Sequence, residues 1–331
     1  MSVTPPALRA VFMTMLAPIA WGTTYIIMSE VVPAERSLLT AAWRVAPAGI
    51  LLTLIGAMAT RWRPRGVEWC HLALLSTLNF VVFFPLLILA ADRLPGGVVA
   101  TAGGLQPLLV ASLGALVTRR SPRLIDLAIG AVAAVGVALV VLRPGAAYDA
   151  VGIAAAIGAN VAFSGGVVLT KWLPPPRDPV GATGWQLLFS AAALIPLSVA
   201  IEGAPPPLTR GTLAGFGYLS VVGTAMAFLV WFQGVRKLPA TVPPLIGLAA
   251  PVTGAIVGWV VLEQGFLPSQ GLGFAIIIGA IWYGSRIAST QPGMGQQPGM
   301  GQQRTWGIAS AEDDPPVAID DAIDGLRCRR S

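Results

Sequence analysis

The chain has 331 residues, of which 55% are hydrophobic and only 11% charged, with a mean hydropathy of +0.74. Soluble domains carry about 25% charged residues, so this composition excludes an ordinary soluble surface and predicts an all-α polytopic membrane protein. The formal net charge is +6. The arginines fall in short loops beside apolar runs and form no continuous basic face, so membrane orientation explains them better than nucleic-acid binding.

Ten apolar runs follow one another along the chain, and each is long enough for a bilayer core of about 30 Å, which needs roughly 20 residues. They lie at 8–28, 38–59, 67–91, 96–118, 124–142, 151–172, 180–201, 213–234, 241–262 and 267–287. We therefore predict ten transmembrane helices, five in residues 1–143 and five in residues 149–287. Residues 288–331 have few apolar groups, which predicts a disordered cytoplasmic tail.

The basic residues orient these helices. If the amino terminus is cytoplasmic, twelve basic residues lie on that side: Arg9, Arg61, Arg63, Arg65, Arg119, Arg120, Arg123, Lys171, Arg177, Arg236, Lys237 and Arg286. The other side has four: Arg36, Arg93, Arg143 and Arg210. Because basic loops stay in the cytoplasm, we predict a multi-pass protein of the cell inner (plasma) membrane with both termini cytoplasmic.

The sequence also contains an internal repeat. At an offset of 144 positions, Phe84, Leu94, Pro95, Pro107 and Gly114 recur as Phe228, Leu238, Pro239, Pro251 and Gly258. At an offset of 142, Trp43-Arg44 aligns with Trp185-Gln186. Five helices per half is an odd number, so the second copy enters the membrane from the opposite side. This predicts inverted repeats, which many secondary transporters use to open one central site to either side.

Several of these motifs carry a resemblance to a known family. They are Trp21-Gly22-Thr23-Thr24-Tyr25 in the first helix, Arg44 in the second, the Leu-Pro…Gln-Pro hairpin and a Gly-rich fifth helix. With its repeat layout, the chain resembles the EamA-type transporters of the drug/metabolite transporter superfamily over about residues 8–287. Family members typically have an acidic residue after helices 4 and 9. Here the second half has Glu263, whereas the first half reads TRRSPR without an acid.

The resemblance implies a secondary carrier, usually an exporter of amino acids, related metabolites or drugs. It also implies a central cavity lined by helices 1–4 and 6–9. It does not name the substrate.

Polar groups at membrane depth are costly unless they face protein or water, so they are the candidate site residues. Arg44, about seven residues into the second helix, could hold a substrate carboxylate or phosphate with two parallel hydrogen bonds. Alternatively, it could reach the outer interface or bond helix-end carbonyls. Gln186, its repeat partner, would supply uncharged hydrogen bonds.

Other candidates are aromatic or polar residues of the predicted helices. Trp21, Tyr25, Trp43 and Trp185 could stack on an apolar or ring-bearing substrate, or serve packing and interface anchoring. Five polar residues could line the path or only bond neighbouring helices: Asn79, Gln106, Asn160, Ser164 and Thr224. Pro107 and Pro251 are candidate hinges, although proline is also tolerated in membrane helices.

Some chemistries are not supported. Glu30, Asp126 and Glu263 fall at helix ends, so proton coupling through a buried carboxylate has no candidate. Metal-ligand clusters, nucleotide-binding loops and hydrolytic arrangements are not evident, so we expect no cofactor, no metal and no enzymatic activity. We predict a secondary transporter, in the direction of export, whose partners are a small-molecule substrate and the lipid bilayer. A homodimer is one option for its assembly. The alternatives are a non-transporting scaffold or partner subunit, and a channel.

Overall fold

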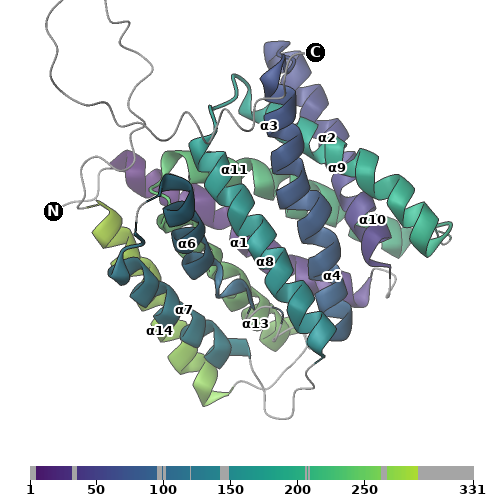
Figure 1. Ribbon diagram of the computed structural model, residues 1–331. Coiled ribbons are helices and arrows are strands. Elements are labelled where there is room, and N and C mark those ends of the chain that lie inside the picture. The colour runs from purple at the N-terminus through teal and green to yellow at the C-terminus, as the bar shows by residue number, and fades with distance from the viewer. Residues whose placement is uncertain are drawn as a thin grey trace, which may run out of the picture.

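Helices packed side by side form the protein, as the computed structural model in Figure 1 shows. The structure describes residues 5–31, 36–94, 99, 102–119, 121–141, 149–205, 207, 209–261 and 267–289, and none of these residues belongs to a strand. Three features of the sequence lie outside the described residues: Pro95 of the first hairpin, Glu263, and the predicted tail from residue 290 onward.

The helices of the first half are α1 (Pro5–Glu30), α2 (Ser37–Thr60), a continuous run of α3 (Val67–Ser76), the π-helix η1 (Thr77–Val82) and α4 (Phe83–Arg93), then α6 (Gln106–Thr118) and α7 (Leu124–Val141). Four of the five predicted runs of the first half match helices to within about three residues at each end, whereas the helix α6 covers only the second part of the predicted run 96–118.

The second half repeats this order. Its helices are α8 (Ala150–Trp172), α9 (Pro179–Glu202), a continuous run of α10 (Arg210–Ser220), the π-helix η2 (Val221–Met226) and α11 (Ala227–Lys237), then α12 (Val242–Gly247), α13 (Ala249–Val261) and α14 (Pro268–Ser289).

The ninth predicted helix differs from the prediction, because it is two helices. α12 ends at Gly247 and α13 begins at Ala249. Pro251 has no N–H to donate to the Gly247 carbonyl, which is the bond that would continue the helix. The first half shows the same feature, since a turn at residues 104–105 precedes α6 and Pro107 lies in its first turn.

Packing partners are exchanged between the halves. α4 packs on α8 while α11 packs on α1; α6 packs on α8 while α13 packs on α1; α3 packs on α9 while α10 packs on α2. The two remaining pairs, α2 with α9 and α7 with α14, join counterparts directly, and α7 and α14 lie side by side at one edge of Figure 1. The two halves are thus related by an approximate two-fold axis that passes between α2 and α9.

α2 and α9 run antiparallel and are bonded at both ends. At the start of α2, the Glu202 carboxylate accepts from the Leu38 and Leu39 amides, each at 2.8 Å. At its end, Thr60 donates to Asp178 at 2.8 Å, and Asp178 also caps α9. Between these ends a Cβ on Gly56 would lie 2.6 Å from the Gly181 Cα, so glycine permits the close approach.

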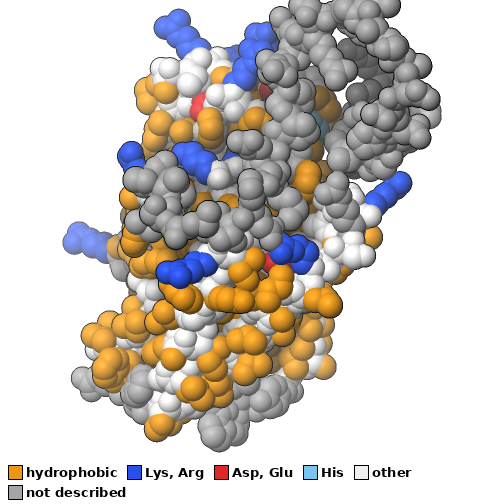
Figure 2. Space-filling model, turned by 90° about the vertical axis from the view of Figure 1, so that its left-hand side faces the viewer, with side chains coloured by type: hydrophobic (Ala, Val, Ile, Leu, Met, Phe, Trp, Pro, Cys, Tyr) orange, Lys and Arg blue, Asp and Glu red, His pale blue; other side chains and the backbone are white. Residues whose placement is uncertain are grey.

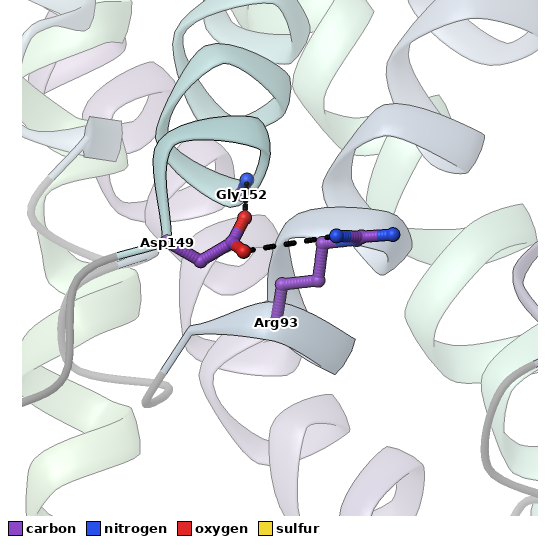
Figure 3. A network of polar contacts seen from close by, with 3 residues as sticks. All are labelled: Arg93, Asp149 and Gly152. Carbon is purple, nitrogen blue, oxygen red and sulfur yellow. Dashed lines mark hydrogen bonds and ion pairs between the residues drawn. The ribbon is translucent and has the colours of Figure 1, made fainter.

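α8 is also held at both ends. At its start Asp149 accepts from the Gly152 amide at 2.7 Å and lies 3.7 Å from Arg93 at the end of α4 (Figure 3). At its end Lys171 donates to the Arg236 carbonyl in the last turn of α11, at 3.0 Å, and to the carbonyl of Leu238, which directly follows α11, at 2.8 Å. Such contacts satisfy helix-terminal groups that would otherwise lack partners.

Apolar side chains cover much of the surface that Figure 2 shows. Large examples are more than half exposed, among them Phe12, Leu54, Met58, Leu116 and Leu124. Monomeric soluble proteins rarely expose continuous apolar surface on this scale. In the described part of the chain, seven helices are long and apolar enough to cross a membrane: Arg9–Met28, Ser37–Thr60, Val67–Arg93, Ala150–Trp172, Pro179–Glu202, Arg210–Lys237 and Val242–Val261.

Candidate functional site

Two π-helical turns occupy matching positions in the two halves. η1 and η2 have six residues each and begin at Thr77 and Val221, 144 positions apart, which is the offset of the repeated hairpins. A π-helical turn interrupts the regular hydrogen-bond pattern and is frequent at functional sites. η2 packs on α2 and η1 packs on α9. The duplication therefore places two irregular turns beside the central helix pair.

Arg44 is only 2% exposed and points at η2. Its Nε donates to Thr224 Oγ1 at 3.1 Å, and its Nη2 donates to the Gly223 carbonyl at 3.2 Å. Its Cζ lies 4.1 Å from the ring centroid of Phe84, a cation–π distance. The guanidinium thus does not reach the interface in this conformation, and its role in substrate binding stays a prediction.

The Gly223 carbonyl has a second donor, because Trp21 Nε1 bonds it at 3.1 Å. Thr224 Oγ1 in turn donates to the Leu219 carbonyl at 2.8 Å. A Cβ on Gly223 would lie 2.6 Å from Thr24 Cγ2, so glycine allows α1 to approach η2. We name this group the η2 half-site; it consists of Trp21, Thr24, Arg44, Gly223 and Thr224.

The counterparts of these residues meet at η1. The Gln186 main-chain carbonyl accepts from Ser76 Oγ at 2.6 Å, while Gln186 Oε1 is buried without a hydrogen-bond partner among the described residues. Asn79 is 0% exposed, and neither Oδ1 nor Nδ2 has a partner in the described part of the chain. A Cβ on Gly166 would overlap the Asn79 carboxamide. We name this group the η1 half-site; it consists of Ser76, Asn79, Gly166 and Gln186.

Aromatic rings fill the space between the half-sites. We call this set the ring cluster; it consists of Trp21, Phe80, Phe84, Phe163, Phe228 and Trp231. Ring centroids lie 5.0 Å apart for Trp21 and Phe228, 5.1 Å for Trp21 and Trp231, and 4.8 Å for Phe80 and Phe228. These separations are typical of favourable aromatic pairs. Trp231 is 0% exposed, and its Nε1 has no hydrogen-bond partner within the described residues.

Two further candidates bond to each other across helices. Gln106 Nε2 donates to Asn160 Oδ1 at 3.1 Å, and Asn160 Nδ2 donates to the Ala156 carbonyl at 2.8 Å. This pair therefore bonds α6 to α8. Ser164, also on α8, is buried, and its Oγ finds no hydrogen-bond partner in the region that the structure describes.

The remaining aromatic candidates contact other rings. Trp43 packs on Phe216 of α10 at 5.6 Å, and Trp185 packs on Trp69 of α3 at 5.0 Å. These contacts join α2 to α10 and α9 to α3, which favours the packing interpretation for both. Tyr25 belongs to α1, but its side chain lies outside the described residues.

Pro107 and Pro251 occupy equivalent places. Both are buried in the first turn of a helix that follows a break, α6 and α13 respectively. Proline is favoured there because the missing N–H would have no intrahelical partner. Their position is compatible with a hinge, which stays a prediction.

Some central residues were not among the sequence candidates. Gly166 and Gly223 define the close approaches, and Phe84 and Trp231 line the centre. The repeat offsets could have pointed to both glycines, since the offset of 144 pairs Asn79 with Gly223 and the offset of 142 pairs Thr24 with Gly166. Within the described residues no three or more His, Cys, Asp or Glu side chains gather into a metal-ligand group.

Known proteins show the same organisation. The model of the EamA-like transporter family matches twice, at residues 8–142 and 150–285. Protein PecM of Dickeya dadantii is 36% identical over 268 residues, covering 80% of this chain and 88% of PecM. A chloroplastic WAT1-related protein of Arabidopsis thaliana is 26% identical, covering 79% of this chain and 66% of that protein. The uncharacterized transporter YwfM of Bacillus subtilis is 23% identical, covering 80% and 89%.

The fold itself has a precedent among solved structures. One crystal structure of a protein matches with a TM-score of 0.69 and 19% identity, covering 85% of this chain and 98% of its own. At this identity the match supports the fold alone. Because the family model matches both halves, the chain belongs to the EamA-like transporter family of the drug/metabolite transporter superfamily and is a multi-pass membrane transporter.

Proposed function

We propose that the protein is a secondary transporter that exports small organic solutes: amino acids, related metabolites or drugs. In this proposal ten transmembrane helices form two inverted five-helix repeats, residues 1–143 and 149–287, in the cell inner membrane. Both termini and the tail from residue 288 lie in the cytoplasm, and the halves open a central site to one side at a time.

The observation that supports this proposal best is the pair of half-sites beside α2 and α9. Counterpart helices that run antiparallel are expected when one repeat is inverted relative to the other. The buried polar groups of both half-sites lie where the two repeats meet, which is where transporters of inverted-repeat architecture bind their substrates. In this arrangement Arg44 is the main substrate ligand, and Gln186 and Asn79 supply uncharged hydrogen bonds from the other half-site.

Counterflow in proteoliposomes tests the proposal. Vesicles containing the purified protein are loaded with a mixture of unlabelled metabolites, and accumulation of each labelled member is measured. We expect saturable accumulation that is reduced at least tenfold in Arg44→Ala, because the main ligand is lost. Arg36→Ala is the matched control, since Arg36 lies at the start of the same helix and its Nη1 donates to the Ala204 carbonyl at 2.8 Å.

Three outcomes would count against parts of this proposal. Transport of the best substrate by Arg44→Ala at the wild-type rate would remove Arg44 from the site. Flux that does not saturate would favour a channel. A protein that shows no flux with any mixture but copurifies with one partner at a fixed ratio would favour the non-transporting scaffold.

A further inference from the structure

The two ends of α8 differ in their charge balance. At its start the Asp149 carboxylate lies 3.7 Å from the Arg93 guanidinium (Figure 3). At its end Lys171 and Arg236 lie together, because Lys171 Nζ donates to the main-chain carbonyl of Arg236 at 3.0 Å. Neither of these two side chains has an acidic partner among the residues that the structure describes. Two positive charges therefore meet there without a described counter-ion.

The internal repeat shows that this difference is specific to the second half. At the offset of 144 positions Asp92 aligns with Arg236, and Arg93 aligns with Lys237. The first hairpin thus has an acid and a base where the second has two bases. Lys237 is exposed, whereas Lys171 and Arg236 are only partly exposed. A charge held partly inside a protein needs a partner of opposite sign more than a charge in open water does.

The two cations keep hydrogen-bond donors that protein groups do not use. Lys171 Nζ has three donors, and two of them bond the Arg236 and Leu238 carbonyls. Arg236 has five side-chain donors, and its Nη1 reaches the Leu173 carbonyl only at 3.5 Å, a long distance for a hydrogen bond. The third donor of Lys171 and the other donors of Arg236 have no acceptor within the described part of the chain.

The pair lies where a membrane protein meets the head groups of the lipids. Lys171 is in the last turn of α8 and Arg236 is in the last turn of α11, both on the predicted cytoplasmic side. Trp172 follows Lys171 and is 40% exposed, and tryptophan is enriched at membrane–water interfaces. The cytoplasmic leaflet contains anionic lipids, and basic pockets between helices on that side bind phosphate-bearing head groups.

We propose that Lys171 and Arg236 bind one phosphate group at the cytoplasmic ends of α8 and α11. The phosphate belongs to an anionic phospholipid or to a soluble anion, because the recognition chemistry is the same for both. Its oxygens accept from the unused donors, and its charge offsets the repulsion between the two cations. Binding therefore stabilises the contact between the two helix ends. The inference goes beyond the proposed transport function and does not depend on the solute carried.

Thermal unfolding of the purified full-length protein in detergent tests the inference. The midpoint is measured with phosphatidylglycerol against phosphatidylcholine of the same acyl chains, and with inorganic phosphate against chloride at equal ionic strength. We expect at least one of the two anions to raise the midpoint by about 3 °C or more over its matched probe, as for a ligand well above its dissociation constant. An increase with phosphatidylglycerol alone identifies a lipid as the source, and an increase with phosphate identifies a soluble anion.

Charge variants assign the increase to the pair. Lys171→Gln combined with Arg236→Gln should abolish it, whereas Lys171→Arg, which keeps the charge, should retain it. Arg61→Gln combined with Arg63→Gln is the matched control, because it removes two exposed positive charges from the same predicted side of the membrane. This control should keep the wild-type increase.

The inference is overturned if neither anion raises the midpoint above its matched probe, or if the Lys171 and Arg236 double variant keeps the wild-type increase. An equal loss in the Arg61 and Arg63 variant would also overturn it, since the effect would then come from the charge of the whole face. Native mass spectrometry of the wild-type protein decides where the double variant fails to fold. Phosphatidylglycerol or phosphate should then stay bound in preference to phosphatidylcholine, and equal retention would overturn the site.

Discussion

The η1 and η2 half-sites share a backbone and differ in their side chains. Each contains a six-residue π-helix, packed against a central helix at the same offset. In the η2 half-site Thr24 is on α1, and Gly223, which it faces, is in the π-helix. In the η1 half-site the glycine is on α8 and the larger Asn79 is in the π-helix. In both half-sites the neighbouring helix can approach the π-helix closely, because Thr24 faces Gly223 and Asn79 faces Gly166.

The half-sites also differ in the hydrogen bonds that their π-helix side chains make. Thr224 both accepts from Arg44 and donates to the Leu219 carbonyl. Asn79 has no partner for its carboxamide in the described part of the chain. The two halves thus share their geometry, but one half-site carries a charge, whereas the other is neutral and its Asn79 carboxamide has no partner among the described residues.

Substitution of Gly166 or Gly223, the glycines that face larger residues, should reduce stability and transport most. Gly166→Ala places a methyl group against the Asn79 carboxamide, and Gly223→Ala places one 2.6 Å from Thr24 Cγ2. Overpacking of this kind costs about 1–3 kcal/mol, so both should melt at lower temperature in detergent and lose transport. Thermal unfolding and counterflow measure the two effects.

Neighbouring glycines are the controls. A Cβ on Gly165 would have Leu78 Cδ1 as its nearest neighbour at 3.8 Å, and one on Gly217 would meet no atom within 4 Å. Gly165→Ala and Gly217→Ala should therefore be tolerated. Adding Asn79→Gly to Gly166→Ala, or Thr24→Gly to Gly223→Ala, should restore much of the lost stability. Equal losses at all four glycines would contradict the proposed packing.

Substitutions of the two polar π-helix residues, Asn79 and Thr224, should change the stability of the protein in opposite directions. Asn79→Leu removes a buried amide that has no partner among the described residues and should stabilise the protein by about 1 kcal/mol, whereas Thr224→Val removes the hydroxyl that accepts from Arg44 Nε and should destabilise it by about 1–2 kcal/mol. Denaturation in mixed micelles measures both. A loss of stability in Asn79→Leu would show that the carboxamide has a structural partner.

A substitution at the end of the α2–α9 pair, at Glu202, should change the stability least. Glu202→Gln keeps one acceptor for the Leu38 and Leu39 amides but removes the negative charge from the start of α2. A charge at a helix amino terminus contributes about 0.3–1 kcal/mol, so the melting temperature should fall slightly with transport unchanged. A loss of transport in Glu202→Gln would extend the functional site to this end of the pair.

The sequence alone determined the helical class, the repeat and the family. Apolar runs of spanning length have few other solutions in a bilayer, because a lipid-exposed backbone must satisfy its hydrogen bonds internally. The offsets of 142 and 144 positions, read from a few residues such as Arg44 and Pro107, predicted which helices are counterparts. The predicted helix bounds agree with the structure to within a few residues for most of the runs.

Only the tertiary structure decided which polar residues meet. The sequence makes Arg44, Asn79, Gln106 and Trp43 candidates alike, since each is a polar or aromatic residue of a predicted membrane helix. Their differences come from neighbours that are more than fifty positions away: Gly223 and Thr224 at Arg44, Gly166 at Asn79, Asn160 at Gln106 and Phe216 at Trp43. The π-helices escaped prediction because their composition is that of an ordinary membrane helix, and a wide turn becomes stable only where the packing around it supplies new partners.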